Sequence, residues 1–213
     1  MPPGRRILRR RQRPGVHRVV EGGNEGEEHA KRAAARDGAA FDALVAPHLG
    51  ALWIVARRRT RSLPASDVDP DDLVQIALGR AWELLPELEW RGDRPFLAWL
   101  VALVDAAAAD RLRYLTAKGR GAVRHRESFA GENEPFSGAK TSSLWRSAAR
   151  REERDRLVKA LDVLTPEQRE VVERHVFEAQ SLGETAAALG IAKNAVWERL
   201  QRGLARLRGA LEA

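Results

Sequence analysis

Apolar side chains recur every three or four residues through most of this 213-residue chain, and this spacing constrains the fold more than any other feature. A spacing of three and four places the apolar side chains on one face of an α-helix. No segment alternates apolar and polar residues for long enough to predict a β-strand. We therefore predict an all-α fold.

Three helices are predicted in the N-terminal half of the chain. Asp37 is a suitable start for the first, which continues through residues 41–53. The second begins at Asp69, and the third follows the segment WRGDRP with Asp93 as its N-cap. The residues expected to face the core are Leu73, Ile76, Ala77, Ala81, Leu84, Leu85 and Leu88 in the second helix and Phe96, Trp99, Leu100, Leu103 and Ala107 in the third.

The composition divides the chain into two helical domains. Residues 1–28 begin with many arginines, turn acidic and contain several Gly and Pro, which predicts a flexible tail. Residues 118–150 are rich in Gly, Ser and Arg and show little periodicity, which predicts a basic, flexible linker. The two helical domains are therefore expected at residues 29–117 and 151–213.

The charge and cysteine content narrow the classes of partner and compartment. The chain has 37 Lys and Arg against 30 Asp and Glu, a net charge of +7, which favours a polyanionic partner such as nucleic acid. It has no cysteine, which excludes disulfides and fits a reducing compartment. The longest apolar window, residues 96–109, is interrupted by Asp105 and is shorter than the roughly 20 residues of a membrane span. We expect a cytoplasmic protein without membrane insertion.

The C-terminal domain has the pattern of a helix-turn-helix. Residues 165–168 (TPEQ) form a capping box that starts one helix. A short helix at 184–189 then meets a turn at Gly190, and a longer helix runs from about residue 193 to 211. The first turns of that longer helix would enter the major groove of DNA. The residues expected to contact bases and phosphates are Lys193, Asn194, Trp197, Glu198, Arg199 and Arg202.

Four aspartates cluster in the segment SDVDPDDLVQ: Asp67, Asp69, Asp71 and Asp72. A metal-dependent enzyme could use such a cluster, but a calcium loop requires a glycine turn and a later Glu, and neither has the required spacing here. As a helix start, Asp69 is the N-cap, Pro70 occupies the first turn, and the next aspartates lie at the positive end of the helix dipole. We interpret the segment as a helix start and expect neither an enzyme nor a metal or cofactor site.

The two halves together resemble the extracytoplasmic-function (ECF) group of bacterial RNA polymerase sigma factors. The segments that support the resemblance are DPDDLVQ (69–75), EWRGDRPFLAWL (89–100), LTPEQREVV (164–172) and LGI (189–191). Their order and spacing make the set specific, and the resemblance extends over residues 30–115 and 153–211.

The resemblance implies a role for each domain. The N-terminal domain would correspond to sigma region 2, which binds the polymerase clamp helices and melts the −10 promoter element. The C-terminal domain would correspond to region 4, which reads the −35 element and docks on the polymerase flap. The implied partners are core RNA polymerase and promoter DNA, and the resemblance also allows an anti-sigma factor.

Candidate contact residues in region 2 follow from the same resemblance. The implied polymerase contacts are Asp69, Asp71, Asp72 and Gln75. The implied −10 contacts are Trp90, Arg91, Arg94 and Arg113, because an aromatic ring and cationic side chains suit capture of single-stranded DNA.

One position departs from the family pattern, and one alternative function stays open. Where the family usually has Arg-Asn, this chain has Asp105-Ala106. Alanine lacks a polar group for a base and Asp105 would repel phosphate, so melting would use neighbouring residues or a different preferred element. The alternative is a free-standing helix-turn-helix regulator whose N-terminal domain senses a ligand or forms oligomers.

Overall fold

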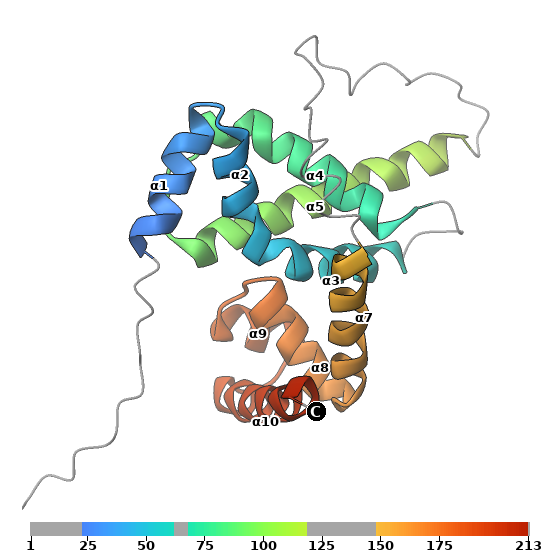
Figure 1. Cartoon of the computed structure of the whole chain (residues 1–213). Coiled ribbons are helices and arrows are strands. Elements are labelled where there is room, and N and C mark those ends of the chain that lie inside the picture. Colours follow the sequence, from blue (N-terminus) through green and yellow to red (C-terminus); the bar gives the residue numbers. More distant parts are fainter. Residues whose placement is uncertain (1–22, 62–67, 119–147, 213) are drawn as a thin grey trace, which may run out of the picture.

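The computed structural model describes residues 23–61, 68–118 and 148–212, and these ranges contain helices and no strand. This confirms the all-α prediction. The helices form two layers, with α1 to α5 in one and α8 to α10 in the other, and α7 extends from the second layer to the first (Figure 1). Residues 1–22 of the predicted tail and 119–147 of the predicted linker lie outside the described residues.

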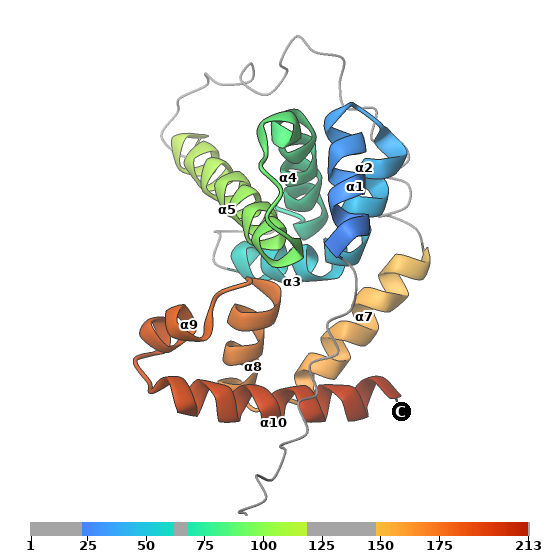
Figure 2. The ribbon, with the colours of Figure 1, turned by 90° about the vertical axis from the view of Figure 1, so that its left-hand side faces the viewer.

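The N-terminal domain consists of five α-helices and two short 3-10 turns among its described residues. They are α1 (Gly23–Ala34), α2 (Gly38–Val45), the short 3-10 turn η1 (Ala46–His48), α3 (Leu49–Thr60), α4 (Pro70–Leu84), the 3-10 turn η2 (Leu85–Glu87) and α5 (Asp93–Lys118). Helices α4, α5 and the α1–α2 pair stand side by side, and α3 crosses beneath them (Figure 2). The largest fully buried side chains in this domain include Phe41, Leu52, Leu73, Leu78 and Leu100.

In the N-terminal domain the predicted helix starts are confirmed in two cases and shifted in a third, and one further helix was not predicted. Asp37 and Asp69 are N-caps whose carboxylates accept hydrogen bonds from backbone amides. Asp93 is the first residue of α5 rather than its cap, because the carbonyl of Gly92 before it already accepts from the Phe96 amide at 3.1 Å. Helix α1 begins at Gly23, inside the segment predicted as a tail. Within this helix Glu27 forms an ion pair with Lys31, one turn further along.

The predicted core face of α4 is partly wrong. Ile76 and Leu84 are 40% and 42% exposed, although both were expected inside. Val74 and Leu78 are fully buried instead. The buried face of α4 is formed by Leu73, Val74, Ala77, Leu78 and Ala81. At about 100° per residue, Ile76 lies on the opposite side of the helix.

Among the described residues, the stretch with the length and composition of a membrane span is residues 38–60, rather than the window 96–109 expected from the sequence; an 18-residue window of it has a mean hydropathy of 1.6. Its length and composition alone would allow it to cross a membrane, but half of it is buried inside the protein. It comprises α2, η1 and α3, which supply Phe41, Leu52 and Val55 to the core. This apolar character is therefore explained by packing within the domain.

The C-terminal domain is built from α7 (Ala148–Asp162), α8 (Pro166–Val172), the π-helical turn η3 (Glu173–Phe177), α9 (Leu182–Leu189) and α10 (Lys193–Glu212). Thr165 and Gln168 form the predicted capping box at the start of α8. Helix α10 packs closely on α8, since a Cβ at Gly203 would lie 3.0 Å from Val172 Cγ2. Its inward side chains are Val196, Leu200 and Leu207, all buried.

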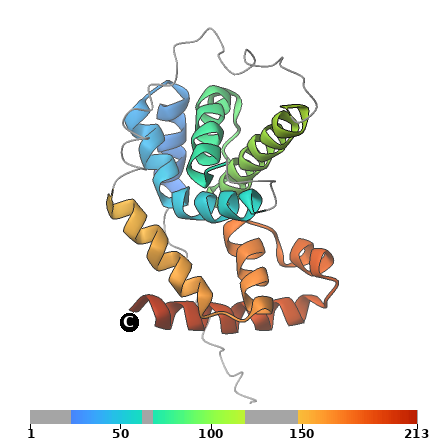
Figure 3. The ribbon, with the colours of Figure 1, turned by 90° about the vertical axis from the view of Figure 1, so that its right-hand side faces the viewer.

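The two domains are in contact in this structure. Helix α3 of the first domain lies against α7 and η3 of the second (Figure 3). The faces that meet carry charged residues, as described below.

Candidate polymerase and nucleic-acid interfaces

The start of α4 presents an acidic surface. The Asp69 carboxylate accepts a hydrogen bond from the Asp71 amide at 2.9 Å, which fixes the first turn of the helix. Asp69 and Asp72 are exposed, whereas Asp71 and Gln75 are half-buried. Four predicted contact residues therefore lie together on the first two turns of one helix, and two of them point into solvent.

A hollow of about 260 Å³ adjoins this acidic surface. It is lined by Val68, Asp72, Leu73, Gln75, Ile76 and Arg111. The Gln75 Nε2 group is buried and has no hydrogen-bond partner among the described residues. The exposed side chain of Ile76 adds an apolar edge. The surface thus offers carboxylates and an apolar contact to a protein partner.

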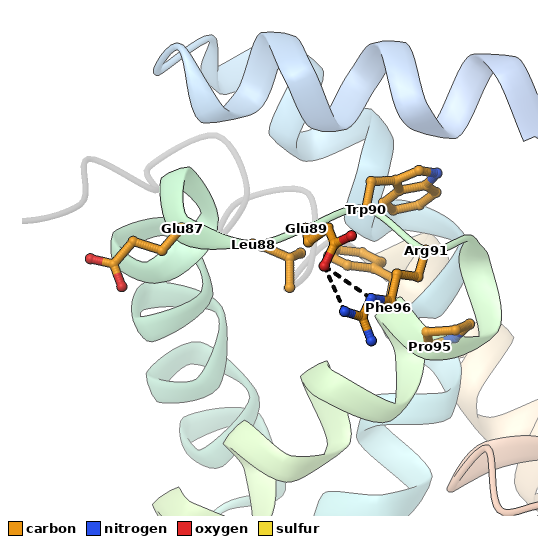
Figure 4. Close-up of a pocket in the computed structure, with 7 residues that line it drawn as sticks. All are labelled: Glu87, Leu88, Glu89, Trp90, Arg91, Pro95 and Phe96. Atoms are coloured by element: carbon orange, nitrogen blue, oxygen red, sulfur yellow. Dashed lines mark hydrogen bonds and ion pairs between the residues drawn. The ribbon is translucent and has the colours of Figure 1, made fainter.

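A second hollow, also of about 260 Å³, lies at the loop between η2 and α5. It is lined by Glu87, Leu88, Glu89, Trp90, Arg91, Pro95 and Phe96. Figure 4 shows Trp90 and Phe96 on one side and the Glu89–Arg91 ion pair spanning the loop. The rings of Trp90 and Phe96 have centroids 5.4 Å apart. A planar ring beside cationic side chains is an arrangement on which an unpaired base can stack.

The predicted −10 residues are only partly brought together. Trp90 is half-buried, and its ring lies 2.8 Å from where a Cβ at Gly26 of α1 would be, so α1 covers part of it. Arg91 donates to Glu89 at 2.6 Å. Arg94 donates to the Gln180 carbonyl of the C-terminal domain at 2.5 Å.

Arg113 is far from this loop. It is paired with Asp110 on α5, and it lies twenty positions beyond the first residue of the helix. At 1.5 Å per residue that is about 30 Å along the axis. The structure therefore does not bring Arg113 to the loop.

The helix-turn-helix of the C-terminal domain has the predicted turn chemistry. Ser181 and Glu184 form a second capping box at the start of α9. Gly190 ends α9 in the left-handed conformation with a φ of 64°, which favours glycine. This turn sends α10 across the domain with its first turns facing outward.

The predicted reading residues lie on the first three turns of α10. Lys193, Asn194, Trp197, Glu198 and Arg202 are exposed, and Arg199 is half-buried. Trp197 is 50% exposed, which is unusual for so large an apolar side chain. Arg202 donates to Glu198 of its own helix at 3.1 Å. The structure thus brings all six together on one accessible helix.

Family models match both domains. Sigma-70 region 2 matches residues 44–117, and Sigma-70 region 4 matches residues 154–207. The chain belongs to the ECF sigma factors of RNA polymerase. The sequence-based resemblance is confirmed, and the two domains are named region 2 and region 4 from here on.

Curated relatives align over most of their length. The RNA polymerase sigma factor CnrH of Cupriavidus metallidurans is 30% identical over 86% of this chain and 93% of its own. The ECF RNA polymerase sigma factor SigL of Mycobacterium tuberculosis is 30% identical over 84% and 93%, respectively. A solved structure of CnrH in complex with the cytosolic domain of CnrY has 29% identity, covers 88% of this chain and 97% of that one, and gives a TM-score of 0.39.

The contact between region 2 and region 4 was missed by sequence reasoning. Arg58 of α3 pairs with Glu170 at 2.7 Å, with Glu173 at 3.4 Å and with Glu178 at 3.5 Å. Arg59 pairs with Glu178 at 3.0 Å. The side chain of Glu178 is only 5% exposed, so these charges are largely removed from water. The sequence shows consecutive arginines in α3 and spaced glutamates within and after α8, but neither pattern predicts that these residues meet.

Asp105 takes part in the same network. Its carboxylate accepts from Arg59 Nε at 2.6 Å. Arg59 therefore bridges Asp105 of region 2 and Glu178 of region 4. The carboxylate expected to repel phosphate is neutralised within the chain.

Two titratable groups at the contact have shifted pKa values. Burial lowers the pKa of His175, and the adjacent Arg94 guanidinium lowers it further. Burial alone would raise the pKa of Glu170, but hydrogen bonds from Arg58 and Arg174 outweigh it, so the net pKa is lowered. The environment at the contact thus favours the ionised form of Glu170 and the neutral form of His175.

The metal interpretation of the aspartate cluster gains no geometric support. Across residues 23–61, 68–118 and 148–212, no three His, Asp or Glu side chains are arranged to hold a metal ion. Asp67 lies outside the described residues. The capping role of Asp69 accounts for one carboxylate, and the ion pair of Asp71 with Arg154 accounts for another.

Proposed function

We propose that this ECF sigma factor binds core RNA polymerase through the acidic start of α4 and directs transcription from promoters read by regions 2 and 4. The observation that supports this most strongly is the placement of Asp69, Asp71, Asp72 and Gln75 beside an apolar hollow. Opposite charge guides association and selects partners, and a basic DNA-binding protein needs such a surface to hold a basic partner.

Region 4 reads the −35 element in this proposal. The first turns of α10 enter the major groove, where Lys193, Asn194 and Trp197 contact base edges and Arg199 and Arg202 contact phosphates. The exposure of Lys193, Asn194 and Trp197 supports the assignment, because base contacts require side chains that can approach the groove.

Region 2 captures the melted −10 element in this proposal. A flipped base enters the hollow at residues 87–96 and stacks on Trp90, while Arg91 and Arg94 contact its phosphates. Arg94 must first leave its region 4 partner, Gln180. Asp105 is held by Arg59 and so need not oppose the DNA.

The family is not one of enzymes, and we propose a soluble cytoplasmic protein without a cofactor. A free-standing helix-turn-helix regulator is the alternative. No observation favours it, because the region 2 match and the acidic surface beside the hollow would then have no role.

Charge reversal tests the polymerase contact. D71K/D72K should lose binding to core RNA polymerase and promoter-specific transcription in vitro, because two attractive carboxylates become repulsive. The matched control is E25K/E28K, which reverses two exposed acids of α1 in the same domain. Binding is measured by co-elution with core enzyme, and circular dichroism checks the fold. Normal assembly of D71K/D72K with core enzyme would reduce these aspartates to helix-capping residues.

A further inference from the structure

One guanidinium group of region 4 occupies a site made by two helices of region 2. Arg154 of α7 is 7% exposed, and its Nη1 donates to the carboxylate of Asp71 on α4. Its Cζ also lies 5.2 Å from the ring centroid of Trp53 on α3. The guanidinium therefore lies against both a carboxylate and an indole.

The chemistry of this site is selective for a planar cation. A guanidinium can donate to a carboxylate and at the same time lie over an aromatic face, and it sheds water more readily than an ammonium group. Asp71 and Trp53 both belong to region 2, and Arg57 of the same region also lies over the Trp53 ring, with its Cζ 5.6 Å from the centroid. Region 2 alone thus supplies a complete seat for one guanidinium, defined here as the Asp71–Trp53 seat.

The residues around the Asp71–Trp53 seat favour a contact between regions 2 and 4 that can separate. Beyond Arg154, the domains are joined by Arg58 and Arg59 with Glu170, Glu173 and Glu178. An apolar contact adjoins these pairs, since a Cβ at Gly50 of α3 would lie 3.7 Å from Leu157 Cδ2 of α7. Charged contacts between domains are nevertheless typical of interfaces that separate. A second basic side chain offered by a partner could replace Arg154 with little change in charge pairing at Asp71.

We propose that the Asp71–Trp53 seat binds a guanidinium side chain of core RNA polymerase, and that Arg154 fills the same seat in the free, closed chain. This inference rests on the proposed function, since it takes Asp71 to be a polymerase contact. Arg154 is then an internal competitor, and region 4 must move away from region 2 before polymerase binds. The same movement releases Arg94 from Gln180.

The competition has a measurable consequence. When only a fraction of molecules is open, the apparent dissociation constant is the intrinsic one divided by that fraction. Removing Arg154 as a competitor should therefore tighten binding to core enzyme. If the closed form predominates about ten to one, the gain is on the order of tenfold.

The distance between domains can be followed by fluorescence transfer. The chain has no cysteine, so A43C and G209C place one dye on an exposed residue of each domain. R154Q should lower transfer efficiency in the free chain and lower the apparent dissociation constant for core polymerase. R154K, which keeps the charge without the planar group, should fall between R154Q and wild type in both measurements. The matched control is R156Q on the same helix, whose side chain is 76% exposed, and it should change neither.

A charge swap separates this inference from the proposed function. D71R/R154D should restore the closed distance in the free chain and yet bind core polymerase poorly, because the seat now repels a guanidinium. Wild-type binding by this swap would overturn Asp71 as a polymerase contact. If D71K/D72K loses polymerase binding while R154Q leaves both distance and affinity at wild-type values, the internal competitor is overturned and the proposed function stands. Circular dichroism of each variant confirms that the helices are retained.

Discussion

Regions 2 and 4 present their proposed contact residues in different states. The proposed reading residues at the start of α10 are exposed except for the half-buried Arg199, and Arg202 donates to Glu198 of its own helix. In region 2, Asp71 is paired with Arg154 and Arg94 donates to Gln180, both of region 4. The DNA-reading helix is therefore available in the closed chain, whereas the contacts of region 2 are partly occupied.

The forces within the domains and between them also differ. Within the domains, apolar side chains such as Leu52 and Leu100 of region 2 and Val172 and Leu200 of region 4 are buried. Between the domains, ion pairs such as Arg58–Glu178 lie beside an apolar contact of α3 with Leu157 of α7. Apolar cores stabilise each domain through burial, while charges removed from water gain little net stability from pairing. Separation of the domains should thus cost much less than unfolding either one.

The largest effect is expected from breaking the core of region 4. L200D places a carboxylate in a position that is 2% exposed, where loss of the leucine side chain alone costs roughly 2–5 kcal/mol and an unpaired charge adds more. Region 4 should unfold and lose duplex DNA binding, while region 2 keeps its own unfolding transition in urea followed by circular dichroism.

The matched control is Q201D, an exposed neighbour on α10, which should change stability by less than about 0.5 kcal/mol. Loss of all helical signal in one step in L200D would show that the domains fold as a unit, contrary to the comparison above.

A smaller effect is expected from acid. The pKa of Glu170 is lowered in the closed chain, because hydrogen bonds from Arg58 and Arg174 exceed the opposing effect of burial. A group whose pKa is lowered stabilises the closed form at pH above its ordinary value of 4.5, and this stabilisation is lost as pH falls through the lowered value. Fluorescence transfer between the domains should therefore fall below about pH 4.5.

E170Q should make this acid transition less steep, since one titrating carboxylate is gone. E167Q serves as the control, because Glu167 is exposed on the same helix and the groups that lower its pKa, led by its own backbone amide and Thr165, belong to region 4. If fluorescence transfer in E170Q depends on pH as it does in wild type, Glu170 does not contribute to holding the domains together.

The sequence predicted local features better than contacts between distant segments. Asp37, Asp69 and the Thr165 capping box were predicted from neighbouring residues and are confirmed, because capping depends on amides within three positions. Ile76 was misplaced because a spacing of three fits the edge of a helical face as well as its centre.

The candidate site shows the same limit. The exposed face of α10 follows from the helical period and the turn at Gly190, so its six residues could be predicted from the sequence. The meeting of Arg154 with Asp71 could not, because it joins segments 83 residues apart through the tertiary arrangement of α4 and α7. Charge alone does not select one partner among 37 basic and 30 acidic residues.

The smallest effect on stability is expected from R202A at the exposed face of α10. This variant tests whether the proposed contact residues of region 4, unlike those of region 2, are available without any change in the fold. Arg202 has a side chain 68% exposed and pairs with Glu198, so its removal should change the free energy of unfolding by less than about 0.5 kcal/mol. Its loss should nevertheless weaken binding of the holoenzyme to promoter DNA and reduce the slope of log affinity against log salt by about 1, because one phosphate contact is lost. R208A, more than one turn further along the same helix and also exposed, should leave the slope unchanged. An equal slope in R202A and wild type would mean that α10 enters the groove with a different face, and Arg202 would then be a solvent-exposed charge whose partner is Glu198.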